Sequence, residues 1–169
     1  MGYLLDTDVF LTAKNLYYGM DICPGYWEWI DVQYRAGHVF SIEKVKDELM
    51  AGDDELVDWA KQRGEGFFLP PDGKLIPELG RATKWANSRE FTPGAISAFM
   101  AAADLYLIAH AKAHGHTVVT LEKPAEDAKK SIKIPTACLA LGVPCVDPFQ
   151  LLRRERARFV LGATATSAR

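Results

Sequence analysis

The chain has 169 residues, of which 49% are hydrophobic and 25% are charged, and its formal net charge is −2. A chain of this length buries about 70% of its unfolded surface, so we expect one domain that folds without a disulfide or structural metal. The slightly negative charge excludes a global field that attracts nucleic acid, so any such contact must come from a local patch.

The cysteines and the apolar runs narrow the class of protein further. Cys23, Cys138 and Cys145 are odd in number and lack CxxC spacing, which argues against a disulfide framework or a zinc site. No basic segment precedes an apolar stretch at the start, and Asp104 interrupts the longest Ala/Leu-rich run. We therefore expect a cytoplasmic protein with no membrane partner.

Short β-rich runs alternate with longer helical patterns, which is typical of βαβ units and predicts an α/β fold with a parallel sheet. Five strands are predicted, over 3–5, 38–40, 67–69, 117–120 and 144–146. Helices are predicted over 9–18, 26–36, 42–50, 54–63, 135–141 and 148–158. A longer helical region is predicted over 76–114, with breaks near 87 and 92–94. We expect residues 1–158 to form the domain and residues 159–169 to be a flexible tail.

An Asp-x-Asp motif, Asp6 and Asp8, follows the first predicted strand. In open α/β sheets, ligands bind in the crevice beyond the carboxyl ends of the strands, so Asp6 is the leading candidate for a functional residue. Asp8 has two interpretations of equal weight: it could cap the helix that begins at Val9, or it could hold a metal-bound water.

Three further acids lie at element ends or on inward-facing positions. They are Glu48, Asp104 and Glu122. Each also has an ordinary structural interpretation, as a solvated helix residue for Glu48, a helix cap for Asp104 and a loop acid for Glu122. Several acids in one crevice raise one another's pKa unless a cation compensates, and hard ions such as Mg²⁺ or Mn²⁺ prefer oxygen ligands. The implied chemistry is metal-assisted phosphodiester hydrolysis.

Four segments together resemble the PIN-domain ribonucleases, a family that includes toxins of bacterial and archaeal toxin–antitoxin pairs. They are Leu4-Leu5-Asp6-Thr7-Asp8, Val45-Lys46-Asp47-Glu48-Leu49, Ala103-Asp104-Leu105-Tyr106-Leu107-Ile108-Ala109 and Val118-Val119-Thr120-Leu121-Glu122. Their order and spacing span about three-quarters of the chain.

The resemblance implies a three-layer α/β/α sandwich in which four acids hold Mg²⁺ or Mn²⁺ and activate water for RNA cleavage. These acids are Asp6, Glu48, Asp104 and Glu122, with Asp8 as a further metal ligand. The sequence departs from the family at two positions, since the fourth acid is often Asp and position 8 is often Asn or Ser. The resemblance also implies an antitoxin protein as partner, and we expect a homodimer.

The predicted substrate contacts border the acidic crevice. They are Lys123, Lys129, Lys130, Thr120 and Lys14. A basic loop beside the acids, which also contains Lys133, could meet the phosphates that flank a scissile bond, although a solvated loop explains the lysines equally well. The four tryptophans are expected in the core or at a dimer surface more than in base stacking, and His110, His114 and His116 are expected at the surface.

Two other functions compete with the metal-dependent nuclease. Leu5-Asp6-Thr7-Asp8-Val9 also resembles the opening motif of haloacid-dehalogenase-like phosphatases, in which Asp6 would be the nucleophile and Asp8 the general acid. That alternative leaves Asp104 without a role. The second is a non-catalytic PIN-like scaffold that binds RNA or protein, against which the full set of acids argues.

Overall fold

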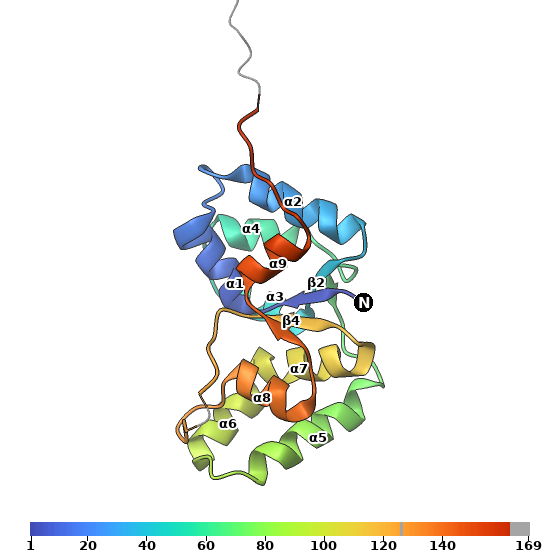
Figure 1. Ribbon diagram of the computed structural model, residues 1–169, viewed down its shortest axis with the longest axis vertical. Helices are drawn as coiled ribbons and strands as arrows, with labels where there is room; N and C mark the ends of the chain where they lie inside the picture. The colour runs from blue at the N-terminus through green and yellow to red at the C-terminus, as the bar shows by residue number, and fades with distance from the viewer. Residues whose placement is uncertain (126, 163–169) are drawn as a thin grey trace, which may run out of the picture.

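The computed structural model describes residues 1–125 and 127–162 and contains a five-stranded parallel sheet between two layers of helices (Figure 1). The strand order is β3-β2-β1-β4-β5. The strands are β1 (Tyr3–Leu5), β2 (Val39–Ile42), β3 (Phe68–Leu69), β4 (Thr117–Val119) and β5 (Cys145–Val146). The predicted α/β sandwich around a sheet of five parallel strands is thereby confirmed.

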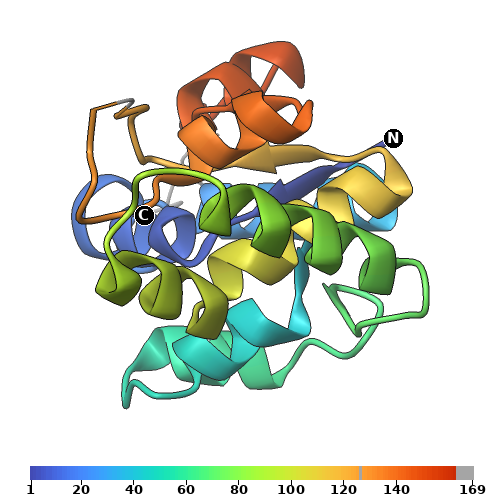
Figure 2. The same cartoon turned by 90° about the horizontal axis from the view of Figure 1, so that it is seen from below.

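The two helical layers follow from the connections between the strands. One layer contains the segments that link β1, β2 and β3, and α9 joins it after β5 (Figure 1). Its elements are α1 (Thr7–Thr12), the π-helix η1 (Ala13–Tyr17), α2 (Pro24–Arg35), α3 (Glu43–Leu49), α4 (Glu55–Lys61) and α9 (Pro148–Arg154). The opposite layer, seen from below in Figure 2, contains α5 (Leu75–Asn87), α6 (Pro93–Ala101), α7 (Ala103–His114) and α8 (Ile134–Leu141).

The predicted helical region 76–114 contains one bend that was not among the predicted breaks, at Ala102. The breaks after Asn87 and at Thr92 occur as predicted, and the Thr92 hydroxyl caps α6 by accepting the Ala95 N–H at 3.2 Å. Ala102 then adopts an extended ψ of 164°, which turns α7 by 65° from α6. Alanine has neither a helix-breaking backbone nor a capping side chain, so the local indication of a new helix start was limited to the interpretation of Asp104 as a helix cap.

No single helix among the described residues is long and apolar enough to cross a membrane. The pair α6 and α7 reaches that length and composition only when the two helices are taken together across their bend.

Aromatic side chains form the centre of the core beneath α1. Phe10 is fully buried and its ring centroid lies 5.4 Å from that of Trp59, 6.3 Å from Phe67 and 6.4 Å from Phe68. Trp27 packs against Trp59 at 5.2 Å. Core packing is therefore confirmed for Trp27 and Trp59.

The expectation that all three histidines lie at the surface is wrong for His110. Its side chain is 3% exposed because α7 is covered by the sheet on one side and by α5 on the other. Burial, followed by the neighbouring His114, lowers the pKa of His110 to about 4, so the ring is neutral at physiological pH. His114 lies 3.0 Å from Asp72, and His116 accepts the Gly2 N–H at 3.0 Å.

The chain after β5 also differs from its prediction in detail. Helix α9 ends at Arg154 rather than at 158. Phe159, placed in the expected tail, packs against Tyr18 at 5.8 Å, Tyr26 at 6.0 Å and Trp29 at 6.5 Å. Residues 163–169 of that tail lie outside the described residues.

Phe10→Ala should lower the free energy of unfolding by about 3–5 kcal/mol, because it leaves a cavity among Trp59, Phe67 and Phe68. Ile76→Ala is the matched control, since Ile76 is 71% exposed and its loss should cost less than about 0.5 kcal/mol. Urea unfolding followed by circular dichroism measures both. Equal effects of the two substitutions would contradict the assignment of Phe10 to the core.

Candidate functional site

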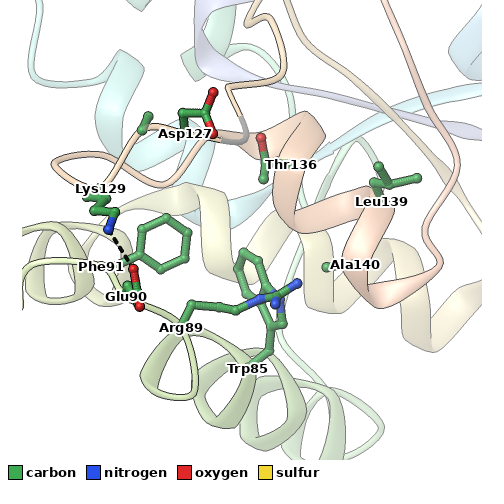
Figure 3. Close-up of a pocket in the computed structure, with 10 residues that line it drawn as sticks. Trp85, Arg89, Glu90, Phe91, Asp127, Lys129, Thr136, Leu139 and Ala140 are labelled. Atoms are coloured by element: carbon green, nitrogen blue, oxygen red, sulfur yellow. Dashed lines mark hydrogen bonds and ion pairs between the residues drawn. The ribbon is translucent and has the colours of Figure 1, made fainter.

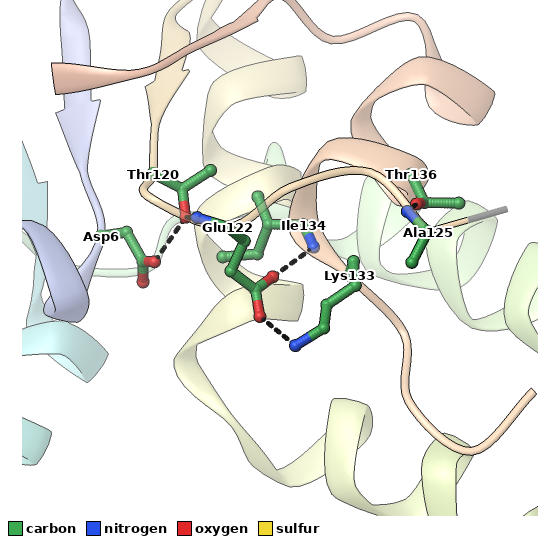
Figure 4. Close-up of polar contacts among 7 residues, drawn as sticks. All are labelled: Asp6, Thr120, Glu122, Ala125, Lys133, Ile134 and Thr136. Atoms are coloured by element: carbon green, nitrogen blue, oxygen red, sulfur yellow. Dashed lines mark hydrogen bonds and ion pairs between the residues drawn. The ribbon is translucent and has the colours of Figure 1, made fainter. Parts of the chain in front are cut away.

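The candidate site lies at the carboxyl edge of the sheet, between β1 and β4. The chain proceeds outward from β1 to β2 and β3, then returns to place β4 on the other side of β1. Such a reversal of strand order leaves a crevice between the two central strands, and open α/β sheets bind ligands there. Asp6 directly follows β1 and Thr120 directly follows β4, so both residues stand at this crevice (Figure 4).

The Asp6 side chain is held by hydrogen bonds from the residues that follow β1 and β4. Its Oδ1 accepts the Thr7 N–H at 2.7 Å and so caps the start of α1, while its Oδ2 accepts the Thr120 hydroxyl at 2.9 Å (Figure 4). The side chain is only 4% exposed. The helix consequently begins at Thr7, and the alternative in which Asp8 caps it is wrong.

Burial raises the pKa of Asp6 to about 7, and the negative charges of Asp104 and Asp8 act in the same direction. The hydrogen bonds from Thr120 and Thr7 oppose the shift but do not cancel it. Near neutral pH the Asp6 carboxyl therefore binds a proton far more readily than an ordinary aspartate, unless a cation replaces the proton.

Asp104 reaches the same crevice from the opposite helical layer. It occupies the first turn of α7, directly after the bend at Ala102. Burial raises its pKa to about 6, and Glu122, Glu48 and Asp8 each add to the shift. Asp104 is thus neither a lone helix cap nor an isolated core acid, because the charges that act on it are the other acids of the predicted set.

Glu48 connects three elements around the crevice. From α3, its Oε1 accepts the Ala103 N–H at 3.0 Å, and its Oε2 accepts the Thr7 hydroxyl. Ala102 has no side chain that could cap α7, so Glu48 supplies the missing acceptor for the first N–H of that helix. The ordinary interpretation of Glu48 as a solvated helix residue is therefore insufficient, although its side chain remains exposed.

Glu122 is anchored on the β4 side of the crevice. Its Oε1 accepts from Lys133 Nζ at 2.8 Å, and its Oε2 accepts the Ile134 N–H at 2.7 Å at the start of α8 (Figure 4). Its own N–H donates to the Thr120 hydroxyl at 3.2 Å. Thr120 therefore lies between Asp6 and Glu122 and positions both.

Asp8 completes the group of five acids. It lies in the first turn of α1 with an exposed side chain. Partial burial raises its pKa, with Glu122 and Glu48 adding to the shift and Lys133 opposing it. Every acid of the group thus acts on at least one other, and we term Asp6, Asp8, Glu48, Asp104 and Glu122 the acidic crevice.

The donor chemistry of the acidic crevice fits a hard divalent cation. Its donors are carboxylate oxygens, the ligands that Mg²⁺ and Mn²⁺ prefer, and the raised pKa values of Asp6 and Asp104 mark negative charge without sufficient compensation. As the side chains stand in residues 1–125 and 127–162, no three acids, histidines or cysteines are close enough to enclose an ion. Asp6 and Asp104 would bind the ion, and the remaining acids would add negative charge around it.

The predicted substrate contacts divide into three groups. Thr120 is buried, and its hydroxyl is engaged by Asp6 and Glu122. Lys14 pairs with Asp54 at 2.6 Å, and Lys129 pairs with Glu90 at 2.5 Å. Lys123 and Lys130 are exposed.

Two residues outside the list of predicted substrate contacts and acids contact the acids directly. Lys133, which belongs to the basic loop that was expected to meet phosphates, donates to Glu122 at 2.8 Å. Thr7, between the two aspartates of the Asp-x-Asp motif, donates to Glu48. Nothing in the local sequence marked Thr7 as a partner of Glu48 or distinguished Lys133 from the other lysines of its loop.

Asp6→Asn should stabilise the metal-free protein at high pH. The folded pKa of Asp6 is raised from 3.8 to about 7, so the unfolded chain loses its proton first, and stability falls as pH rises from about 4 to 7. With EDTA present at pH 8, the free energy of unfolding of Asp6→Asn should exceed that of wild type by about 2–4 kcal/mol. At pH 4 the two free energies of unfolding should differ little.

Asp58→Asn is the control for this measurement, because the Asp58 side chain is 74% exposed on α4. Urea unfolding at both pH values gives the free energy of unfolding of wild type and of the two variants. A difference between Asp6→Asn and wild type that does not change with pH would contradict a raised pKa for Asp6.

Comparison with solved structures supports the same fold. A chain in the crystal structure of VapBC2 from Rickettsia felis, bound to a DNA fragment from their promoter, aligns with a TM-score of 0.53 and 14% sequence identity. The alignment covers 87% of the present chain and 98% of that chain. At this identity the likeness concerns the fold alone. No curated protein matches the sequence significantly.

A family model described as "Domain of unknown function (DUF4411)" matches residues 3–159. The match includes both central strands and all five acids of the acidic crevice. Because it spans nearly the whole chain, the protein belongs to the DUF4411 family.

Proposed function

We propose that the protein is a metal-dependent endoribonuclease of PIN-like type that hydrolyses RNA phosphodiester bonds in the cytoplasm with Mg²⁺ or Mn²⁺. The observation that carries the proposal is the buried Asp6 at the switch point of the sheet, with its pKa raised to about 7 by burial and by Asp104 and Asp8. Clusters of acids with raised pKa values in a crevice are typical of functional sites.

Each acid has a distinct part in this proposal. Asp6 and Asp104 hold the cation, and Glu48, Glu122 and Asp8 set the charge around it. When bound, the ion lowers the pKa of the attacking water and stabilises the charge that develops on the phosphate. Thr120 and Thr7 orient Asp6 and Glu48 through their hydroxyls, so that neither acid must be ordered when substrate arrives.

In this proposal, basic side chains near the acids bind the phosphates of the RNA backbone. Lys133 lies at the crevice beside Glu122, and Lys123 and Lys130 are exposed on the adjoining loop. These three lysines would contact phosphates that flank the scissile bond. Lys14 and Lys129 would have to exchange their present carboxylate partners, Asp54 and Glu90, for phosphates.

The contacts of Asp6 and Asp104 favour the nuclease over the alternatives. A phosphatase with Asp6 as nucleophile needs a whole phosphate group to reach the Asp6 carboxylate, whose side chain is only 4% exposed, whereas a single cation needs less access. It also gives no role to Asp104, whose charge acts on Asp6. A non-catalytic scaffold gives no reason for five acids to tolerate mutual repulsion.

RNA cleavage should require Mg²⁺ or Mn²⁺ and should fall by about 100-fold or more in Asp6→Asn or Asp104→Asn, because each change removes an oxygen ligand and one negative charge. Asp58→Asn should cleave like wild type, since Asp58 is exposed on α4. The measurement follows a mixture of single-stranded RNAs with and without EDTA. Metal-independent cleavage, or unchanged cleavage by both variants, would contradict the proposal, and a phosphorylated Asp6 trapped during turnover would favour the phosphatase.

We further propose that the nuclease is the toxin of a toxin–antitoxin pair and that it forms a homodimer. The support is the resemblance of the four acid-bearing segments to PIN-domain toxins, together with the fold shared with a VapBC2 structure. Expression of the wild-type chain should arrest bacterial growth, and co-expression of the protein encoded beside it should restore growth. Asp6→Asn, expressed at the same level, should not arrest growth. Arrest by both forms would separate toxicity from the acidic crevice.

A further inference from the structure

A pocket of about 670 Å³ lies beyond the acidic crevice, on the side of α5 and α8 (Figure 3). Its walls come from the end of α5, the turn between α5 and α6, residues 127–129 and α8. We term it the Trp85 pocket, and its lining includes Trp85, Arg89, Glu90, Phe91, Asp127 and Lys129. Its volume lies within the range of about 300–1,000 Å³ that small-molecule sites occupy.

Two aromatic rings line the Trp85 pocket. Trp85 and Phe91 contact each other edge to face, with centroids 5.7 Å apart and an angle of 66° between the rings. Both side chains are only partly buried, unlike the core residues Trp27 and Trp59. Partly exposed aromatic rings in a pocket offer a surface on which an unpaired base can stack.

The charges in the pocket balance. Lys129 pairs with Glu90 at 2.5 Å, and the other charged side chains among the described residues of the lining are Arg89 and Asp127, both exposed (Figure 3). A site for phosphate or for an acidic peptide would need an excess of positive charge. One guanidinium and one carboxylate instead match a neutral ligand that carries both acceptors and donors.

We propose that the Trp85 pocket binds an unpaired guanine of the RNA substrate. Guanine presents O6 and N7 as a pair of acceptors, which suits Arg89, and N1–H and the 2-amino group as a pair of donors, which suits the Asp127 carboxylate. Adenine, cytosine and uracil each lack one of these pairs. Trp85 and Phe91 provide the stacking surface, and the Lys129–Glu90 pair joins the two walls of the pocket.

Helix α8 connects the pocket to the acidic crevice. The Ile134 N–H holds Glu122, and Thr136, two residues further along the helix, accepts the Ala125 N–H and lines the pocket (Figure 4). The helix whose first N–H holds Glu122 therefore also contributes to the wall of the pocket. The inference deepens the proposed ribonuclease function and rests on it, because the bound guanine would then lie near the scissile bond and select the cleavage position.

Binding of mononucleotides in EDTA tests the pocket without requiring cleavage. The probes are GMP, AMP, CMP, UMP and IMP, and the readout is the indole N–H signal of Trp85 in NMR spectra, assigned by its loss in Trp85→Phe. GMP should bind with roughly tenfold preference over AMP, CMP and UMP, and IMP, which lacks the 2-amino group, should bind less tightly than GMP.

Arg89→Ala and Asp127→Asn should each weaken GMP binding by roughly tenfold. Arg81→Ala is the matched control, because Arg81 lies on α5 and pairs with Glu78 outside the pocket. Equal binding of all mononucleotides, no perturbation of Trp85, or unchanged binding by both variants would overturn the proposal. The proposal would also be overturned if GMP does not bind and a partner protein instead binds in a way that depends on Arg89.

The two proposals fail separately. If the protein cleaves RNA but does not bind GMP at Trp85, the guanine site is wrong and the nuclease stands. If it binds GMP as described but Asp6→Asn cleaves RNA like wild type, the acidic crevice is not the catalytic site and the base-binding pocket stands.

Discussion

The hydrogen bond from Thr120 to Asp6 joins the two central strands at the point where strand order reverses, and the site is built around it. It holds a buried carboxylate in the crevice and, through the Glu122 N–H, fixes the chain that follows β4. A buried carboxylate has a large desolvation cost, and here the acidic neighbours Asp104 and Asp8 add repulsion that the hydrogen bonds from Thr120 and Thr7 offset only in part. A divalent cation bound in the crevice would offset this free-energy cost, and this is the physical basis of the metal dependence that we propose.

The surrounding fold orients the other acids through backbone groups that would otherwise lack partners. Glu48 accepts the first N–H of α7 and Glu122 accepts the first N–H of α8. Both helices begin without a side-chain cap of their own, so each acid stabilises a helix start while it is held at the crevice. These two glutamates therefore have a structural role beside the functional role that we propose for them, and substitution of either would affect local stability as well as charge.

The sequence predicted the fold and the acid set because both leave local patterns. The buried run at Tyr3–Leu5 and the β-branched run at Thr117–Val119 identify the two central strands, and Asp6 follows the first of them directly. The burial of His110 could not be predicted, because it depends on how α7 packs against the sheet and α5. The bend at Ala102 was indicated only by the interpretation of Asp104 as a helix cap, and the pairing of Lys133 with Glu122 depends on the path of the loop between β4 and α8. Asp8 was the ambiguous half of the motif, and the structure removes its capping role while leaving its charge in the crevice.

The direct test of this account is the position of bound Mn²⁺, measured by anomalous diffraction from crystals of the full chain grown with the ion. We expect an anomalous peak within coordination distance of carboxylate oxygens of both Asp6 and Asp104, and no such peak in Asp6→Asn crystals grown in the same way. A peak that avoids Asp6 and Asp104, or none at saturating Mn²⁺ in an undistorted crevice, would contradict the claim that these acids are gathered to hold a cation.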